Sequence, residues 1–305
     1  MRLRVLGSAA GGGLPQWNCG CTNCAEARRP TGRIKTRTQD SIALLGEHGG
    51  WFLINASPDI HRQIQGFRDL APVSGRRTPI EGVVLTNGDL DHTLGLFSLR
   101  ESTPLVVYAT EPVWHGLSAG NVIFRTLQRF EGQLTFRKLE LGHEIELQGR
   151  DGEPTGLRLR PWSAPGKVPK HLEGLAPPSP EDNVGLSITD ALTRRRVEIA
   201  TAVGAPGPYL DDLEGAEACF FDGTFWSSDE LIRLGLGTAR AEDMAHWPIG
   251  GPDGSLAVLA ARATGRVIYQ HLNNTNPVLF PGSPERRAVE LADFSVAEDG
   301  LELIL

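Results

Sequence analysis

Two carboxylates and a histidine follow one apolar segment of this chain. Residues 82–85 are typical of a buried strand, residues 94–97 predict the start of a helix, and between them lie Asp89, Asp91 and His92. Carboxylate oxygens and imidazole nitrogens are common metal ligands, and a strand end that leads into a helix is a common place for them. We therefore expect a metal site here. The alternative is that Asp91 caps the helix and His92 is an ordinary polar group with satisfied hydrogen bonds.

Two further apolar segments end in residues of the same kind. Residues 218–221 are followed by Asp222, and residues 266–270 are followed by His271. Either residue alone is more often a cap or a surface group, but their matching placement at strand ends predicts that they converge on one ion with the first pair. The expected ligands are Asp91, His92, Asp222 and His271. Such a set with open positions suits non-haem Fe(II), which oxygenases use, and it suits zinc as well.

A second metal site is predicted in a loop near the start of the chain. Three of the four cysteines, Cys19, Cys21 and Cys24, lie within six residues. The spacing C-x-C-x-x-C brings three thiolates close enough for one tetrahedral ion, for which zinc is the usual metal. Three sulfurs largely close the coordination sphere, so we expect a structural zinc whose fourth ligand comes from elsewhere in the chain. The alternative is a chance grouping of cysteines in a loop.

The composition limits the classes of function. The 305 residues carry a net charge of −7, which argues against a nucleic-acid surface and is compatible with a small-molecule or peptide substrate. Hydrophobic residues make up 40% of the chain, enough for a sizeable core. The apolar runs are shorter than the ~20 residues that span a membrane. The apolar stretch at the start is also too short for a signal peptide. We therefore expect a cytoplasmic protein with no membrane partner.

Strand-like segments occur in both halves of the chain, with helical segments between them. Apolar spacing predicts helices at residues 116–130 and 285–291. With no repeat and no clear linker, this order predicts one α/β domain over residues 1–305, in which two sheets pack together under helices as an αββα sandwich. The predicted strands cover residues 3–7, 41–45, 51–55, 82–85, 104–108, 134–137, 144–147, 156–160, 184–189, 196–200, 218–221, 266–270, 294–296 and 301–305.

The stretch that contains Asp91 also resembles the metallo-β-lactamase superfamily, whose motif T-H-x-H-x-D-H-x-x-G lies at the end of a strand. Asp91 and His92 match the motif, whereas Asn87 and Asp89 stand in place of its first two histidines. A further histidine of the same metal position is missing at residues 164–166. The resemblance implies an αββα sandwich of two mixed sheets. All the superfamily histidines that this chain lacks belong to one of the two metal positions, so the resemblance also implies a site for a single metal ion.

The same resemblance assigns roles to two more residues. Residues 244–249 resemble the segment that supplies an active-site histidine in the tRNase Z and phosphodiesterase branch, so His246 is expected to move protons. Asp89 is expected to act in the active site as a weak metal ligand or by orienting His92. The alternative for His246 is a buried structural histidine.

Four motifs narrow the resemblance to the PqqB family. Residues 7–19, 87–92, 221–226 and 271–277 closely resemble it, and the resemblance runs from end to end. It implies a bacterial protein of pyrroloquinoline quinone (PQQ) biosynthesis. The implied reaction uses Fe(II) and O2 to hydroxylate the tyrosine ring of a small peptide-derived substrate, a cross-linked Glu-Tyr unit. Loss of the first-position histidines leaves room for O2 and substrate beside the iron.

Two other functions are compatible with these residues. A carrier would move PQQ or a precursor toward the periplasm without turnover, and a metal-dependent hydrolase would turn over phosphodiesters or lactams with zinc. The oligomeric state, a homodimer included, is left open. Candidates for stacking on a substrate ring are Trp17, Phe225, Trp226 and Trp247, and candidates for binding substrate carboxylates are Lys167, Lys170 and Arg37.

Overall fold

The strands of the computed structural model, which describes residues 1–101, 103–262 and 265–305, form two sheets of seven strands each. The first sheet has the order β14 (Glu302–Ile304), β1 (Arg2–Gly7), β2 (Ser41–Leu45), β3 (Trp51–Ile54), β4 (Ile80–Val84), β5 (Leu105–Ala109) and β6 (Leu134–Lys138). The second has the order β13 (Ser295–Val296), β12 (Arg266–Gln270), β11 (Ala218–Asp222), β10 (Arg196–Ala200), β9 (Val184–Asp190), β8 (Pro154–Ser163) and β7 (Ile145–Gln148).

Both sheets are mixed. In the first sheet β1, β2 and β3 pair antiparallel, and β3 to β6 run parallel. In the second sheet β7 to β10 pair antiparallel, and β10 to β13 run parallel. Parallel neighbours end at the same edge of a sheet. The segments that follow β11 and β12 are therefore delivered side by side, and β4 delivers the corresponding segment of the first sheet.

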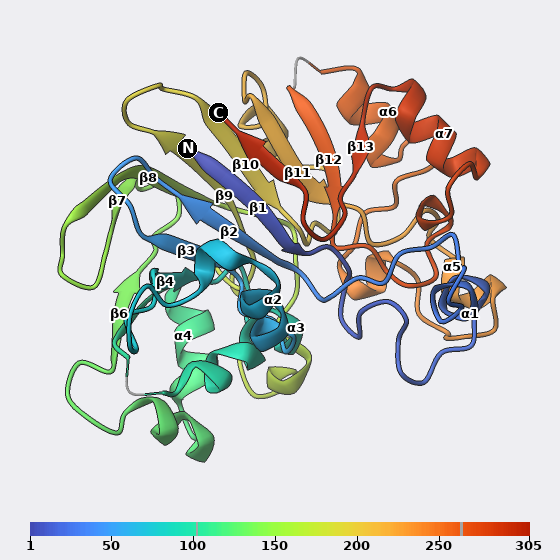
Figure 1. The fold of residues 1–305 in the computed structure, drawn as a ribbon. Helices are drawn as coiled ribbons and strands as arrows, with labels where there is room; N and C mark the ends of the chain where they lie inside the picture. Colours follow the sequence, from blue (N-terminus) through green and yellow to red (C-terminus); the bar gives the residue numbers. More distant parts are fainter. Residues whose placement is uncertain (102, 263–264) are drawn as a thin grey trace.

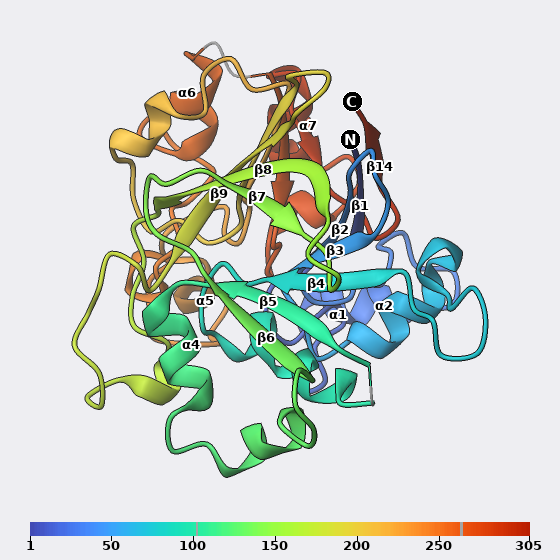
Figure 2. The same ribbon diagram turned by 90° about the vertical axis from the view of Figure 1, so that its left-hand side faces the viewer.

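Short helices cover the outer faces of both sheets, which confirms the predicted αββα class (Figure 1; Figure 2). The α-helices are α1 (Thr22–Ala27), α2 (Ile60–Gly66), α3 (Leu90–Thr93), α4 (Glu111–Ser118), α5 (Glu230–Arg233), α6 (Ser255–Ala260) and α7 (Pro284–Leu291). Short 3-10 turns are η1 (Arg68–Leu70), η2 (Leu94–Leu99), η3 (Val122–Leu127), η4 (Lys170–Leu172), η5 (Pro208–Asp211), η6 (Glu242–Met244) and η7 (Pro277–Leu279).

An apolar core lies between the two sheets because side chains alternate along each strand. In β11, Phe220 packs in the cluster between the sheets, whereas Phe221 packs in the outer cluster under α6 and α7. In β12, Ile268 and Tyr269 divide in the same way. All four side chains are buried. This double anchoring holds the ends of β11 and β12, and thus the segments that follow them.

The helix predicted at residues 116–130 is wrong in its extent. Helix α4 ends at Ser118, and the chain coils again only in η3. Gly120 between them has a φ of 66°. Glycine adopts this left-handed conformation readily, and it ends a helix. The helix expected from residue 94 begins earlier, at Leu90 in α3, and continues as η2.

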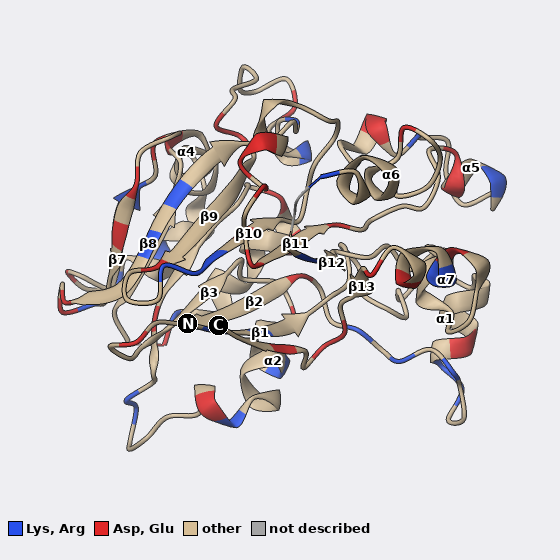
Figure 3. Ribbon diagram, turned by 90° about the horizontal axis from the view of Figure 1, so that it is seen from above, with Lys and Arg blue, Asp and Glu red and all other residues tan. Residues whose placement is uncertain are grey.

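Charged residues of both signs are interspersed along the ribbon (Figure 3). Over the described ranges, the helices are all too short or too polar to cross a membrane.

Candidate metal centre

A carboxylate and two imidazoles meet where the segments after β4 and β12 come together. Asp91 Oδ2 lies 3.2 Å from His271 Nε2 and 3.9 Å from His92 Nε2. The two imidazole rings are nearly perpendicular, at 86°, with 5.1 Å between their centroids. The three ligand-type atoms lie within 4.8 Å of one another. This spacing is close enough for one metal ion to bind all three.

These three side chains need a positive charge among them. His92 Nε2 is buried and has no hydrogen-bond partner in the part of the chain that the structure describes. Burial by itself would raise the pKa of Asp91, but the charge of His92 and the hydrogen bond of His271 hold it well below its usual range. Burial would lower the pKa of His271, yet Asp91 raises it to about 9. A bound cation would neutralise Asp91 and give His92 Nε2 a partner, so the residues fit a metal ion.

Backbone strain marks the same region. His271 has a φ of 59°, and Ala245, directly before His246, has a φ of 60°. Asn55, whose side chain contacts the strand end before Asp91, has a φ of 62°. Residues other than glycine adopt this conformation rarely, and such residues concentrate at functional sites. The fold therefore holds His271 and His246 in orientations that ordinary extended backbone would not give.

Asp222 lies beside His246, and both of its oxygens have protein partners. Oδ2 is 2.7 Å from His246 Nδ1 and accepts a hydrogen bond from the Val203 N–H at 2.8 Å. Oδ1 accepts from the N–H and O–H of Thr224 at 2.9 Å and 2.6 Å. Burial by itself would raise the pKa of Asp222, but the charge and hydrogen bond of His246 hold it below its ordinary value. An imidazole oriented by a carboxylate is suited to moving a proton at its other nitrogen.

The four predicted ligands and His246 thus fall into two groups that share His271. One group is Asp91, His92 and His271, and the other is Asp222, His246 and His271. The structure brings all the predicted residues to one place. It leaves the first group with ligand atoms free to face an ion, whereas the oxygens of Asp222 are engaged. Asp222 as a fourth ligand therefore stays a prediction.

Amide side chains fill the region where the superfamily motif has its missing histidines. Asn87 Nδ2 donates to Asn183 Oδ1 at 3.2 Å, and Asn87 Oδ1 accepts the N–H of Asp89 at 3.0 Å. A Cβ atom at Gly166 would stand 2.5 Å from the Cβ of Asn183. A histidine at position 166 would therefore collide with Asn183. The Asn183 side chain that bonds Asn87 thus also takes the space that a histidine at position 166 would need.

Asp89 lines a small pocket together with Lys167 and His246. The residue that contacts His92 Nδ1 is not Asp89 but Thr86, whose Oγ1 lies 3.2 Å away. Thr86, and not Asp89, is therefore the residue whose side chain orients the His92 ring. A role for Asp89 as a weak metal ligand stays a prediction.

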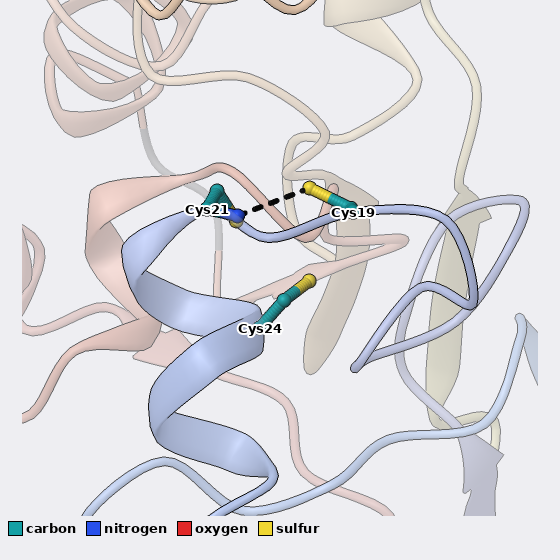
Figure 4. Close-up of side chains that lie close together, drawn as sticks. All are labelled: Cys19, Cys21 and Cys24. Carbon is teal, nitrogen blue, oxygen red and sulfur yellow. Dashed lines mark hydrogen bonds between the residues drawn. The ribbon is translucent and has the colours of Figure 1, made fainter.

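The three cysteines lie close together (Figure 4), and one further side chain, Asn274, reaches their sulfurs. Asn274 Nδ2 lies 3.2 Å, 3.5 Å and 3.3 Å from the sulfurs of Cys19, Cys21 and Cys24. With ordinary zinc bond lengths, the sulfur-to-oxygen edge of a tetrahedral site is about 3.5 Å. A 180° turn of the amide, which places Oδ1 where Nδ2 now lies, would complete such a tetrahedron. Burial raises the pKa of Cys24 to about 11, so a cation is needed to hold this thiolate.

The candidate substrate contacts differ in their access to the site. Arg37 is buried against Ser8 Oγ and the Ala297 carbonyl, so it cannot reach a substrate. Lys167 shares the pocket of His246, and its ammonium donates to the Asp243 carbonyl at 3.3 Å. Lys170 is exposed in η4. Lys167 is therefore the candidate cation that the structure places beside the site.

The aromatic candidates separate in the same manner. Phe225 lies 5.9 Å from the His246 ring, between centroids. Trp247 is buried against Phe221 in the outer core, and Trp17 is 87% exposed. The structure thus puts Phe225 next to the site residues and gives Trp247 a packing role.

Sequence patterns missed several polar residues that support the site. Asp40 is buried with its Oδ2 3.8 Å from His92 Nε2, and it accepts hydrogen bonds from the amides of Asn55 and Gln270. Thr224 contacts both His246 and His271. Their signal in the sequence was position alone: Asp40 directly precedes β2, and Thr224 directly follows the Asp222-Gly223 pair.

Comparison with known proteins points to one fold and one set of relatives. The family model described as "Beta-lactamase superfamily domain" matches residues 50–272. A curated relative, "Coenzyme PQQ synthesis protein B" of Bradyrhizobium diazoefficiens, is 42% identical over 312 residues and covers 100% of both chains. The same protein of Ruegeria pomeroyi is 41% identical over 308 residues, also with 100% coverage of both.

Solved structures give the same result. The crystal structure of Zn²⁺-bound PqqB from Methylobacterium extorquens superposes with a TM-score of 0.91, at 38% identity and 100% coverage of both chains. A diphosphatase of the PhnP family superposes with a TM-score of 0.66 at 18% identity, covering 100% of this chain and 97% of its own. At that identity the diphosphatase shows a shared fold and nothing about activity.

Proposed function

This chain belongs to the PqqB family within the β-lactamase superfamily, and from that membership we propose that it acts in the biosynthesis of pyrroloquinoline quinone. We further propose that it is a non-haem iron hydroxylase. In this proposal the enzyme adds one oxygen atom from O2 to the tyrosine ring of a cross-linked Glu-Tyr unit derived from a peptide.

The observation that supports this reaction most directly is the group Asp91, His92 and His271. Two imidazoles and one carboxylate with open positions are the ligand set of many Fe(II) oxygenases. Iron held by these side chains would supply the redox chemistry that activation of O2 requires. Zinc fits the same atoms, so the choice of iron rests on the proposed reaction.

The neighbouring residues would bind and orient the substrate. Lys167 would attract a substrate carboxylate, and Phe225, buried beside His246, would support that imidazole ring. Asp222 holds Nδ1 of His246, so Nε2 of that ring is the nitrogen left to accept or return a proton at the substrate. Each of these roles belongs to a side chain of this protein and can be tested by substitution.

The filled first-metal region favours an oxygenase over a two-metal hydrolase. A hydrolase of that kind needs a second complete ligand set, about 3.5–4 Å away. In this chain the Asn87–Asn183 amide pair and Gly166 occupy the region where the superfamily has the histidines of its first metal position. We therefore propose that the centre holds a single ion.

The cysteine group supports a separate proposal. We propose that Cys19, Cys21 and Cys24 bind a structural zinc with Asn274 as the fourth ligand. The loop would then be fastened to the segment that follows β12.

The proposed reaction is tested with protein reconstituted anaerobically with Fe(II) and given ¹⁸O2, the cross-linked dipeptide and a small-molecule reductant. The reductant is needed because insertion of one oxygen atom leaves the other to become water, at the cost of two electrons and two protons. We expect one ¹⁸O atom in the ring by mass spectrometry. Product formed anaerobically by the zinc protein would instead favour a hydrolase. No product with any metal, together with stoichiometric PQQ binding, would favour a carrier.

A further inference from the structure

One buried hydroxyl joins the two groups of the centre. Thr224 directly follows the Asp222-Gly223 turn, and its side chain is buried. Its Oγ1 lies 2.6 Å from Asp222 Oδ1 and 2.9 Å from the His271 carbonyl oxygen. The same atom lies 2.9 Å from His271 Nδ1 and 3.0 Å from His246 Nδ1.

A threonine hydroxyl has one proton to donate and two lone pairs to accept with. Two of the four neighbours, the Asp222 carboxylate and the His271 carbonyl, can only accept. The Thr224 proton must therefore go to an oxygen, and the Asp222 carboxylate is the nearer and charged one. Both imidazole nitrogens are then favourable neighbours only if they carry a proton and donate it.

For His271 this assignment fixes which nitrogen is free. If Nδ1 carries a proton and donates it to Thr224, Nε2 is the nitrogen that faces Asp91 Oδ2, 3.2 Å away, and the one left for a metal ion to bind. We propose that Thr224 is a positioning residue that keeps a proton on Nδ1 of His271, so that Nε2 is the nitrogen that binds a metal ion. Through its hydrogen bond to Asp222, the same hydroxyl also links His271 to the Asp222–His246 pair.

His92 is held by a threonine hydroxyl in the same way, with Thr86 in the place of Thr224. Thr86 Oγ1 donates to Asn55 Oδ1 at 3.0 Å, and it lies 3.2 Å from His92 Nδ1. The Asn55 amide cannot be reversed, because its Nδ2 donates to the Asp40 carboxylate at 3.0 Å. The Thr86 proton is thus also committed to an oxygen, and His92 Nδ1 must donate. Both histidines are therefore held with Nδ1 on a threonine hydroxyl and Nε2 facing Asp91, where a metal ion could bind.

Metal affinity gives the first test, and it needs no turnover. The inference shares the ligand group of the proposed function, but Co(II) binding is independent of hydroxylation, so the two fail separately. Co(II) is titrated against a competing chelator into protein whose cysteine site already holds zinc. We expect Thr224→Val to bind Co(II) roughly 10- to 100-fold more weakly, the usual cost of losing a group that orients a metal ligand. Thr224→Ser keeps the hydroxyl and should stay within about threefold of wild type.

A matched control separates this effect from the general loss of a buried hydroxyl. Thr155 is buried and donates to the Leu147 carbonyl at 2.7 Å, away from the centre. Thr155→Val should leave the Co(II) affinity unchanged. Wild-type affinity in Thr224→Val, or an equal loss in Thr224→Ser, would overturn the proposal.

A second measurement uses the wild-type chain and so does not depend on whether a variant folds. In a long-range ¹H–¹⁵N spectrum of the zinc-loaded protein with labelled histidines, His271 should show a protonated Nδ1 and a metal-bound Nε2. The His271 signals are identified by their absence from the His271→Ala spectrum. A metal-bound Nδ1 with a protonated Nε2 would refute the assignment.

Discussion

The two candidate metal sites of this protein are built in opposite ways. Cys19, Cys21 and Cys24 come from one short loop and helix, whereas Asp91 and His271 are 180 positions apart and follow strands of different sheets. The cysteine group can assemble locally, but the histidine–carboxylate group exists only when the sheets pack together. The two sites meet in one segment, because Asn274 follows His271 by three residues and reaches the three sulfurs.

Because the two sites are built from different segments, loss of a histidine ligand should affect the histidine–carboxylate site and leave the cysteine site intact. His92→Ala and His271→Ala should each abolish ring hydroxylation, because each removes one of the two imidazoles available to the iron. Metal analysis should show the active-site iron lost and the zinc at the cysteines retained. The far-ultraviolet circular dichroism spectrum should stay that of the wild type. Loss of both metals in His271→Ala would mean that the segment after β12 couples the sites more tightly than this comparison allows.

His246→Ala should slow turnover by about 10²–10⁴-fold, the range for loss of a proton-transferring side chain. Iron content should be retained, because Asp91, His92 and His271 are untouched. Single-turnover measurements with quantified iron distinguish this outcome from metal loss. Unchanged turnover would return His246 to the structural role considered from the sequence.

Cys24→Ser tests whether the cysteine group binds a structural zinc. We expect the zinc to be lost and the free energy of unfolding to fall by more than about 4 kcal/mol, because metal binding energy is folding energy. Urea denaturation with parallel zinc analysis checks both effects. Cys219→Ser is the matched control, since Cys219 is buried in β11 away from the loop and should keep the zinc. Freshly purified wild-type protein without zinc, together with an unaltered free energy of unfolding in Cys24→Ser, would indicate that the site holds no structural metal.

The buried carboxylate of Glu198 in β10 has a pKa shift in the opposite direction from those of Asp91 and Asp222. Glu198 accepts hydrogen bonds from Trp162 Nε1 and Ser187 Oγ, and burial raises its pKa to about 7. Asp91 and Asp222, beside histidines, have lowered pKa values instead. Arg196 Nε lies 3.3 Å from Glu198 Oε1 but does not offset the effect of burial on the pKa of Glu198, whereas the histidines beside Asp91 and Asp222 do offset it.

The raised pKa of Glu198 makes a pH prediction. The folded protein prefers Glu198 protonated, so its contribution to stability is full below about pH 4.5 and is lost as the pH rises through about 7. Glu198→Gln, which cannot ionise, should gain stability relative to wild type over that interval, by on the order of 3 kcal/mol. Urea denaturation of both proteins at pH 5 and pH 8 measures the difference. A difference that does not change with pH would contradict the raised pKa.

Much of the fold was readable from the sequence. Each predicted strand segment corresponds to a strand of the two sheets, and the segments 41–45, 196–200 and 266–270 agree in both bounds. The reason is that strand burial is encoded locally, as alternating or continuous apolar residues between turn residues. The helix predicted at residues 116–130 failed because apolar spacing alone does not register the left-handed break at Gly120.

The candidate ligands could also be predicted from the sequence, because side chains of metal-ligand type occur at or shortly after the ends of apolar strands, at Asp91, Asp222 and His271. Their grouping was not. Only the packing of the sheets decided that Asp222 holds His246 while Asp91 faces His271. The contacts of Thr224 and Asn274 likewise depend on which chain segments meet. Sequence periodicity reports the environment of each element separately, whereas a site formed by several elements is determined by how they pack in three dimensions.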